Sequence, residues 1–192
     1  MFLRVTGGDF RGLMLRMPAR RTTRPTAQVV REAIFDLLGP LTPQSRVLDL
    51  FSGSGALGIE ALGRGAELAV FVEHDTVACQ AIRVNLETVR AADRGHIVRG
   101  ELPAALSRLS GAFDYVFADP PYTFAAWGAL LERCLHECLV TEHTVVVVEY
   151  SSRTTLECGH HFSIVKQRRY GDSSIALVNL GGLEPQVDPT LT

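Results

Sequence analysis

Four consecutive residues, Asp119-Pro120-Pro121-Tyr122, follow the apolar segment 113–118 and carry the clearest chemistry in this chain. The Asp119 carboxylate and the Pro120 carbonyl can both accept hydrogen bonds, and the two prolines restrict the backbone that presents them. The Tyr122 ring can stack on a flat partner. A planar amino group is a weak nucleophile because its lone pair is delocalised. A loop that accepts its hydrogens suits methyl transfer to such a nitrogen.

A glycine turn precedes this loop by about a third of the chain. The segment 46–51 is expected to be a buried strand, and Gly53, Gly55 and Gly58 follow it before a helical segment over 59–64. Glycines allow a tight bend and close approach to a ligand, and the start of the helix offers free N–H groups. The same spacing fits a dinucleotide-binding turn with an acidic residue roughly 20 positions later, so a dehydrogenase has to be considered.

Asp49 and the later loop favour S-adenosylmethionine over a nicotinamide. The Asp49 carboxylate suits a ligand ammonium but would repel a pyrophosphate. Glu73 follows the strand-like segment 68–72 and is expected to accept from both ribose hydroxyls, and adenine contacts should follow the strand over 96–99. The predicted cofactor-binding residues are Asp49, Phe51, Ser52, Gly53, Ser54, Gly55, Glu73, His74, Gly100 and Glu101.

Alternating strands and helices must position these motifs. Their spacing is typical of βαβ units and predicts a parallel sheet behind an amino-terminal hairpin and a helix over 26–38. The chain has 192 residues and 46% hydrophobic content, which fits about one domain. The remaining predicted elements are helices over 76–90 and 124–139 and strands over 145–148, 162–166 and 175–179.

In this order, the motifs resemble those of class I S-adenosylmethionine-dependent methyltransferases. The resemblance implies an α/β, Rossmann-like fold with a mostly parallel seven-stranded sheet and an antiparallel last strand, preceded by an N-terminal β-hairpin and helix. It also implies Asp119, Pro120, Pro121 and Tyr122 as catalytic residues. The loop alone does not choose the acceptor, because the superfamily uses it for adenine N6, cytosine N4, guanine N2 and protein glutamine.

The terminal motifs resemble the RsmD family of bacterial enzymes more closely, and the match covers roughly residues 4–180. This resemblance implies methylation of guanine N2 in small-subunit (16S) ribosomal RNA, with the guanine amino group bonded to Asp119 and the Pro120 carbonyl and Tyr122 stacked on the base. One departure is Thr26-Ala27-Gln28, where the family often has Thr-Thr-Asp. The matching motifs are Gly7-Gly8-Asp9-Phe10-Arg11-Gly12, Arg24-Pro25-Thr26, Val30-Arg31-Glu32-Ala33-Ile34-Phe35 and Arg169-Tyr170-Gly171-Asp172-Ser173.

Charge is distributed unevenly along the chain. Residues 1–31 have a net charge of +6 and the remainder −8, although the whole chain carries only −2. A basic extension on an acidic catalytic body suits RNA, because arginines neutralise phosphates and stack on bases. A solvated hairpin is the plainer alternative. The residues predicted to bind RNA are Arg20, Arg21, Arg24 and Arg31.

We expect a basic hairpin extension over 1–24, a methyltransferase domain over 25–180 and a mobile tail over 181–192. The partner is expected to be 16S rRNA or the assembling small ribosomal subunit, and the chain a monomer. No leader or membrane-spanning segment is visible, which predicts a cytoplasmic protein. No metal is expected, because none of the four cysteines forms a Cys-x-x-Cys pair and His160-His161 has no third ligand.

Several alternatives stay open on the sequence. An adenine-N6 DNA or RNA methyltransferase would share every catalytic residue, and only the terminal motifs argue against it. A protein-glutamine methyltransferase typically has Asn in place of Asp119. A nonenzymatic RNA-binding module would leave the cofactor motifs and the loop without a purpose.

Overall fold

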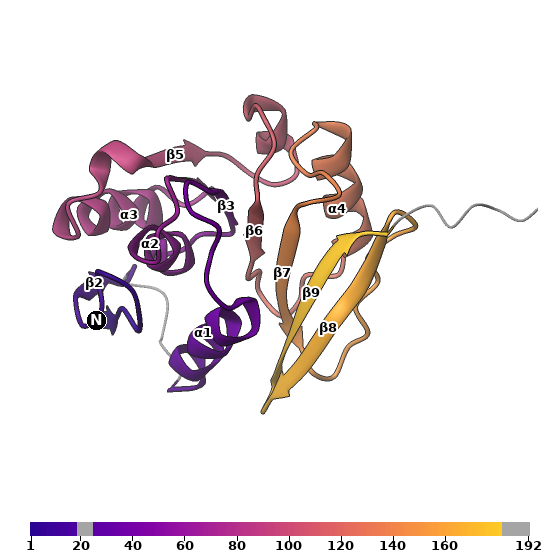
Figure 1. The fold of residues 1–192 in the computed structure, drawn as a ribbon, viewed down its shortest axis with the longest axis horizontal. Coiled ribbons are helices and arrows are strands. Elements are labelled where there is room, and N and C mark those ends of the chain that lie inside the picture. The colour runs from indigo at the N-terminus through magenta and orange to yellow at the C-terminus, as the bar shows by residue number, and fades with distance from the viewer. Residues whose placement is uncertain (19–24, 182–192) are drawn as a thin grey trace, which may run out of the picture.

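A seven-stranded sheet forms the centre of the computed structural model, which describes residues 1–18 and 25–181 (Figure 1). Its strands lie in the order β5-β4-β3-β6-β7-β9-β8. The first five of these are parallel, and β9 runs antiparallel to both β7 and β8. This topology confirms the predicted Rossmann-like sheet with an antiparallel last strand. The bounds are β3 Arg46–Leu50, β4 Leu68–Glu73, β5 Gly95–Arg99, β6 Tyr115–Ala118, β7 Val145–Ser151, β8 Phe162–Tyr170 and β9 Ser173–Leu180.

Helices cover both faces of the sheet, because successive strand residues point to opposite sides and both sides are apolar. Phe71 and Phe117 pack on the face that carries α1, α2 and α3, whereas Val72 and Val116 pack on the face that carries α4 and η2. The helices are α1 Pro25–Leu38, α2 Ala56–Gly63, α3 Thr76–Thr88 and α4 Trp127–His136, with short 3-10 segments η1 Ala92–Arg94 and η2 Ala104–Arg108.

The helix predicted over 124–139 is shorter at both ends in the structure. The Phe124 N–H donates to the Pro121 carbonyl over 2.8 Å, so the start of this segment belongs to the turn that closes the proline loop. At the other end, Cys138 has a φ of 56°, a left-handed conformation that does not continue an α-helix. The helix prediction was therefore correct in place and too long.

The amino-terminal hairpin pairs β1 Phe2–Arg4 with β2 Met14–Arg16 and packs on the end of α2. Gly8 has a φ of 67°, and a Cβ there would lie 2.1 Å from the Gly63 carbonyl oxygen. The next amide, that of Asp9, donates to that oxygen over 2.7 Å. The buried side chains of Leu3, Val5 and Leu15 join the same core as the sheet, so the hairpin is packed rather than free.

Glu60 is a buried carboxylate that joins the hairpin, α1 and α2. Its side chain is inaccessible to solvent, and it binds Arg31 Nε over 3.0 Å and Arg64 Nη2 over 2.8 Å. It also accepts hydrogen bonds from the Thr6 amide and hydroxyl. Burial lowers the pKa of Arg31, and the adjacent Glu60 charge opposes that shift.

Arg31, one of the four arginines predicted to bind RNA, is buried. It is 5% exposed, and its Nη2 also donates to the Arg4 carbonyl over 2.6 Å. This arginine therefore stabilises the interior of the fold, and its contact with RNA stays a prediction. The motif neighbours of Arg31 gave no sign of the buried acid 29 residues away.

Candidate active site

The loop after β3 turns sharply at the carboxyl-terminal edge of the parallel strands. Phe51, Gly53 and Gly55 all have positive φ angles, of 59°, 58° and 75°. Glycine adopts this conformation readily, whereas the non-glycine Phe51 is an uncommon case that clusters at functional sites. The Ser52 hydroxyl donates to the Asp49 carbonyl over 2.6 Å and fixes the turn from inside.

Asp49 lies directly under this turn. Its side chain is 2% exposed, and Oδ2 accepts from the Gly58 amide over 2.9 Å, in the first turn of α2. A Cβ on Gly58 would lie 2.4 Å from the Phe71 ring, so the third glycine of the motif lets α2 approach the sheet closely. The carboxylate thus orders the glycine turn, and its contact with a ligand ammonium stays a prediction.

Glu73 ends β4 next to the same turn. Its Oε2 accepts from the Gly53 amide over 2.8 Å, and its Oε1 accepts from the His74 and Asp75 amides over 2.8 and 2.9 Å. A carboxylate has about four lone-pair positions, so the side chain is held rigidly while it can accept further hydrogen bonds. The strand-end acid predicted to bind a ribose is therefore locked to the glycine turn.

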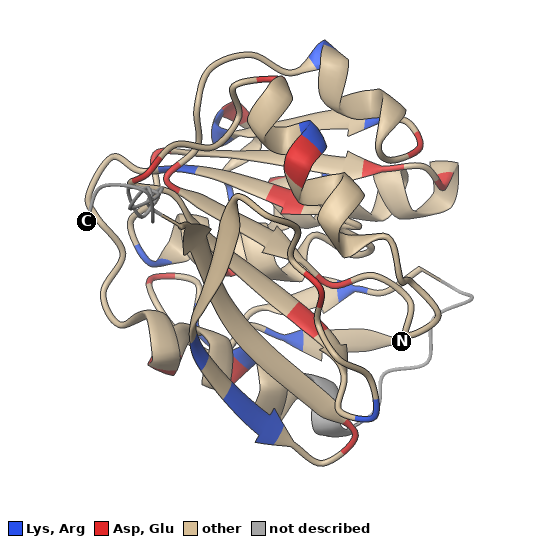
Figure 2. Ribbon diagram, turned by 90° about the vertical axis from the view of Figure 1, so that its right-hand side faces the viewer, with Lys and Arg blue, Asp and Glu red and all other residues tan. Residues whose placement is uncertain are grey.

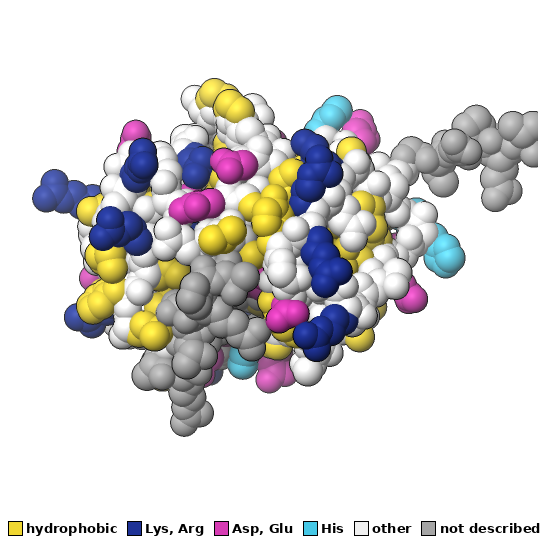
Figure 3. All heavy atoms as spheres, turned by 90° about the horizontal axis from the view of Figure 1, so that it is seen from below, with side chains coloured by type: hydrophobic (Ala, Val, Ile, Leu, Met, Phe, Trp, Pro, Cys, Tyr) yellow, Lys and Arg dark blue, Asp and Glu magenta, His cyan; other side chains and the backbone are white. Residues whose placement is uncertain are grey.

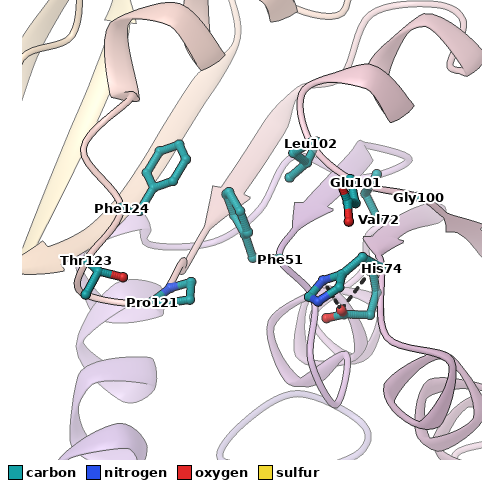
Figure 4. Close-up of a pocket in the computed structure, with 10 residues that line it drawn as sticks. Phe51, Val72, His74, Gly100, Glu101, Leu102, Pro121, Thr123 and Phe124 are labelled. Atoms are coloured by element: carbon teal, nitrogen blue, oxygen red, sulfur yellow. Dashed lines mark hydrogen bonds and ion pairs between the residues drawn. The ribbon is translucent and has the colours of Figure 1, made fainter.

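A cavity of about 400 Å³ opens beside Glu73. Figure 4 shows Phe51 between two groups of residues, with Pro121, Thr123 and Phe124 on one side and the ends of β4 and β5 on the other. Its volume lies within the roughly 300–1,000 Å³ typical of small-ligand pockets. Of the predicted cofactor residues, Phe51, Glu73, His74, Gly100 and Glu101 line it, and sequence reasoning missed Val72, Leu102, Thr123 and Phe124.

The proline loop borders the same cavity from β6. Asp119 follows the last residue of that strand, Pro120 is buried, and Pro121 lines the cavity. Tyr122 is 40% exposed, and its hydroxyl lies 2.5 Å from Ser173 Oγ. The tyrosine is thus anchored at its hydroxyl while much of the side chain faces solvent, an arrangement suited to stacking on a planar group.

Glu149 is a further titratable group at this edge that sequence reasoning missed. It lies near the end of β7, and its Oε1 accepts from the Ser173 hydroxyl over 2.8 Å. Burial raises the pKa of Glu149 to about 8, the Asp119 charge acts in the same direction, and the Ser173 hydrogen bond opposes the shift. The available signal was an acid after an apolar strand, the same pattern that identified Glu73 and Asp119.

Three aromatic rings connect the glycine turn to the proline loop. The ring centroids of Phe51 and Phe124 lie 5.2 Å apart, and those of Phe124 and Trp127 lie 5.0 Å apart, both edge-to-face. Such contacts favour specific ring orientations, so the two loops are packed as one unit. The glycine turn and the proline loop are thereby held in a fixed relation.

Basic side chains gather on the strand next to this edge. Lys166, Arg168 and Arg169 of β8 are exposed, and Arg169 pairs in register with Ser174, the residue after Ser173. Figure 2 shows basic residues towards the end of this strand, and Figure 3 shows a row of Lys and Arg side chains on the face seen from below. Arg20, Arg21 and Arg24 lie outside the described residues.

Within residues 1–18 and 25–181, no group of three or more His, Cys, Asp or Glu side chains could hold a metal ion. The cysteines Cys79, Cys134 and Cys158 are buried, and Cys138 is exposed without a disulfide partner. Burial raises the pKa of Cys134 to about 12, which keeps it a neutral thiol. None of the helices in the described ranges has the length and apolar character needed to span a bilayer.

Comparison with known proteins adds independent evidence. A family model described as conserved hypothetical protein 95 matches residues 3–179. The chain is 35% identical to "Putative rRNA methyltransferase YlbH" of Bacillus subtilis, over 94% of this chain and 100% of that one. It is 38% identical to ribosomal RNA small subunit methyltransferase D of Escherichia coli, over 62% and 60% of the two chains. The solved structure of "Putative methyltransferase yhhF" from Escherichia coli superposes with a TM-score of 0.81 at 28% identity, covering 94% of this chain and 98% of that one.

Proposed function

The chain belongs to the family described as conserved hypothetical protein 95, the RsmD family of methyltransferases, and from this premise we propose that it methylates guanine N2 in 16S ribosomal RNA. One observation carries the proposal. The cavity that Glu73 borders is also lined by Pro121 of the Asp-Pro-Pro-Tyr loop. A nucleotide-type cofactor and a planar amino group can therefore meet at one edge of the sheet.

S-adenosylmethionine is the cofactor, and the described residues fit it. Glu73 can accept from the ribose hydroxyls because its carboxylate is held by three backbone amides at the rim of the cavity. The apolar side chains of Phe51, Val72 and Leu102 suit the adenine ring. When bound, this cofactor supplies an electrophilic methyl group.

The acceptor is held by the proline loop. The Asp119 carboxylate and the Pro120 carbonyl accept from the exocyclic amino group, which leaves the nitrogen lone pair less delocalised as the group pyramidalises. Tyr122 stacks on the base, and its hydroxyl stays on Ser173. After transfer, Asp119 is placed to take the proton that the methylated nitrogen loses.

The direct test incubates the protein with labelled S-adenosylmethionine and small ribosomal subunits purified from cells that lack the endogenous enzyme. The RNA is then digested, and the labelled nucleoside is identified by mass spectrometry. We expect N2-methylguanosine at one position. Label on adenine would replace the guanine assignment with the adenine-N6 alternative, and absence of label on any RNA would overturn the proposal.

Replacing Glu73 by Ala is expected to weaken S-adenosylmethionine binding about 100-fold, measured by titration calorimetry. The substitution removes a charged acceptor of the ribose hydroxyls and also releases the Gly53 amide. Hydrogen bonds to charged groups contribute about 1.5–3 kcal/mol each, and about 2.7 kcal/mol corresponds to that factor. Glu73→Gln keeps one acceptor oxygen and should lose less. Equal affinity of Glu73→Ala and the wild type would contradict the ribose role.

Replacing Lys166, Arg168 and Arg169 together by Gln should weaken RNA binding and flatten its salt dependence. Each phosphate that a basic side chain no longer neutralises lowers the slope of log affinity against log salt by about 0.7–0.9. Cofactor affinity should not change, because these side chains do not line the cavity. Filter binding over a salt series measures the slope.

The matched control for the β8 surface is Arg90→Gln. Arg90 is exposed and follows α3, which leads to β5, and β5 is the outer strand on the side of the sheet opposite β8. It should leave the slope unchanged. The combined variant of Arg20, Arg21 and Arg24 is expected to act like the β8 variant, as the net charge of the first 31 residues suggests. A salt slope equal to that of the wild type in both combined variants would favour a merely solvated basic surface.

A further inference from the structure

Two neighbouring parallel strands bring acidic residues to the acceptor side of the site. Ala118 of β6 pairs with Val148 of β7, so the next residues, Asp119 and Glu149, stand side by side in register. Ser173 begins β9 and touches both parts of the acceptor site. Its hydroxyl donates to Glu149 and lies 2.5 Å from the hydroxyl of Tyr122.

We propose that Glu149 is a positioning residue of the acceptor site, which fixes Tyr122 through Ser173 and retains a proton so that the negative charge of the carboxylate pair stays on Asp119. This inference rests on the proposed function for its consequence, since the fixed ring and the charged Asp119 are the groups that would hold the acceptor base. Its geometric basis is the strand register and the two hydrogen bonds of Ser173.

A chain of two hydrogen bonds connects Tyr122 to Glu149 through Ser173. An oxygen of Glu149 accepts from Ser173, so the Ser173 oxygen is left to accept from the Tyr122 hydroxyl. In that arrangement the ring of Tyr122 is held at its far end. Removal of the Ser173 hydroxyl or of the Tyr122 hydroxyl breaks the same hydrogen bond between them. The effects of the two substitutions on kcat should therefore not be independent.

Two adjacent carboxylates in a partly buried site do not both ionise at neutral pH without a large cost. Glu149 is the one that keeps the proton, because burial and the Asp119 charge raise its pKa to about 8. Below about pH 8 Glu149 keeps its proton, so at neutral pH the pair carries one negative charge, which the proposal assigns to Asp119. As the pH rises through about 8, Glu149 ionises and its charge repels that of Asp119. The arrangement with a single negative charge is therefore lost on the alkaline side.

Among residues 1–18 and 25–181, Asp119 is the main charged neighbour of Glu149. The remaining residues of β7 and all of β9 are uncharged, and the proline loop contributes Tyr122. Helix α1, which packs against β9, carries three charged residues in its described part. Of these, Arg31 is bound to Glu60 and Glu32 accepts from Gln28, and the third is Asp36. The basic residues of β8 lie beyond β9 in the sheet.

The first measurement titrates the side-chain carboxyl carbons of carbon-13 glutamate-labelled protein by NMR, with Glu149→Gln used to assign the signal. We expect a midpoint near 8 rather than the usual value near 4.5. Asp119→Asn should lower that midpoint, because it removes the neighbouring charge, and this variant keeps the test valid if Glu149→Gln does not fold. A midpoint near 4.5 in the wild type would overturn the inference.

The second measurement compares kcat over pH 6–10. The wild type should lose activity as the pH rises through about 8, whereas the activity of Glu149→Gln should not fall over that range, whatever its level at pH 7, because its amide does not ionise and still accepts from Ser173. Ser173→Ala and Tyr122→Phe should each lower kcat about tenfold, as expected for one hydrogen bond, and the double variant should lose no more than either. An alkaline loss retained in Glu149→Gln, or multiplicative losses in the double variant, would contradict the role.

These readouts separate the inference from the proposed function. The NMR titration needs no substrate, so a protein that methylates no RNA but titrates near 8 would count against the function alone. An active guanine methyltransferase in which Glu149 titrates near 4.5 would count against the inference alone.

Discussion

Asp119→Ala is expected to lower kcat for methyl transfer about 1,000-fold while S-adenosylmethionine affinity stays within about twofold of the wild type. Removal of one preorganised hydrogen-bond partner at a reacting group typically costs 100- to 1,000-fold, and here the removed partner also carries the charge and takes the proton. Asp119 follows β6, whereas the Glu73 carboxylate that we assign to the ribose is held by amides of the glycine turn and of β4's own end. Single-turnover kinetics and calorimetry measure the two quantities separately.

The control for this variant is Glu142→Ala, which removes a carboxylate of equal charge from a side chain that is 81% exposed. Its kcat should equal that of the wild type. Asp119→Asn adds a finer comparison, because the amide keeps one acceptor oxygen but has no charge to offer. If Asp119→Ala turned over at a tenth of the wild-type rate or faster, the catalytic role of this residue would be lost.

The parts of the site that the sequence predicted are those set by local patterns. Apolar segments of four to six residues indicated the strands, and an acid at a strand end was enough to place Glu73 at the edge of the sheet. The glycines predicted a tight turn, and Gly53 does meet Glu73 there. Gly53 follows β3 and Glu73 ends the parallel neighbour β4, so their proximity needed only the βαβ order.

Other parts depend on pairings that no local pattern contains. Tyr122 meets Ser173 51 residues later, and this contact exists only because β9 inserts between β7 and β8. Arg31 looked like one more member of a basic segment, yet it pairs with Glu60, an acid within an otherwise apolar helix. That isolated acid was the available signal, because a charge in such a position is usually paired.

Glu60→Ala is expected to lower the free energy of unfolding by about 3–5 kcal/mol, measured by urea denaturation. The substitution leaves the Arg31 guanidinium, 5% exposed, without its carboxylate, and an unpaired buried charge has a cost of that order. The Thr6 amide, which donates to Glu60, would lose its partner as well. The amino-terminal hairpin should therefore detach before the rest of the fold unfolds. This decrease is a large fraction of the roughly 5–15 kcal/mol that typically separates folded and unfolded states.

Two comparisons decide whether burial of the ion pair causes the expected loss of stability in Glu60→Ala. Arg153→Ala breaks an ion pair with Asp172 whose side chains are 79% and 65% exposed, and surface pairs of this kind contribute about 1 kcal/mol or less. The double variant Arg31→Met/Glu60→Leu removes both buried charges at once, so it should be more stable than Glu60→Ala, although the Thr6 amide still lacks a partner. If Glu60→Ala cost no more than Arg153→Ala, the carboxylate would not be what joins the hairpin to α1 and α2. The hairpin would then have to be held by its apolar contacts alone, through Leu3, Val5 and Leu15.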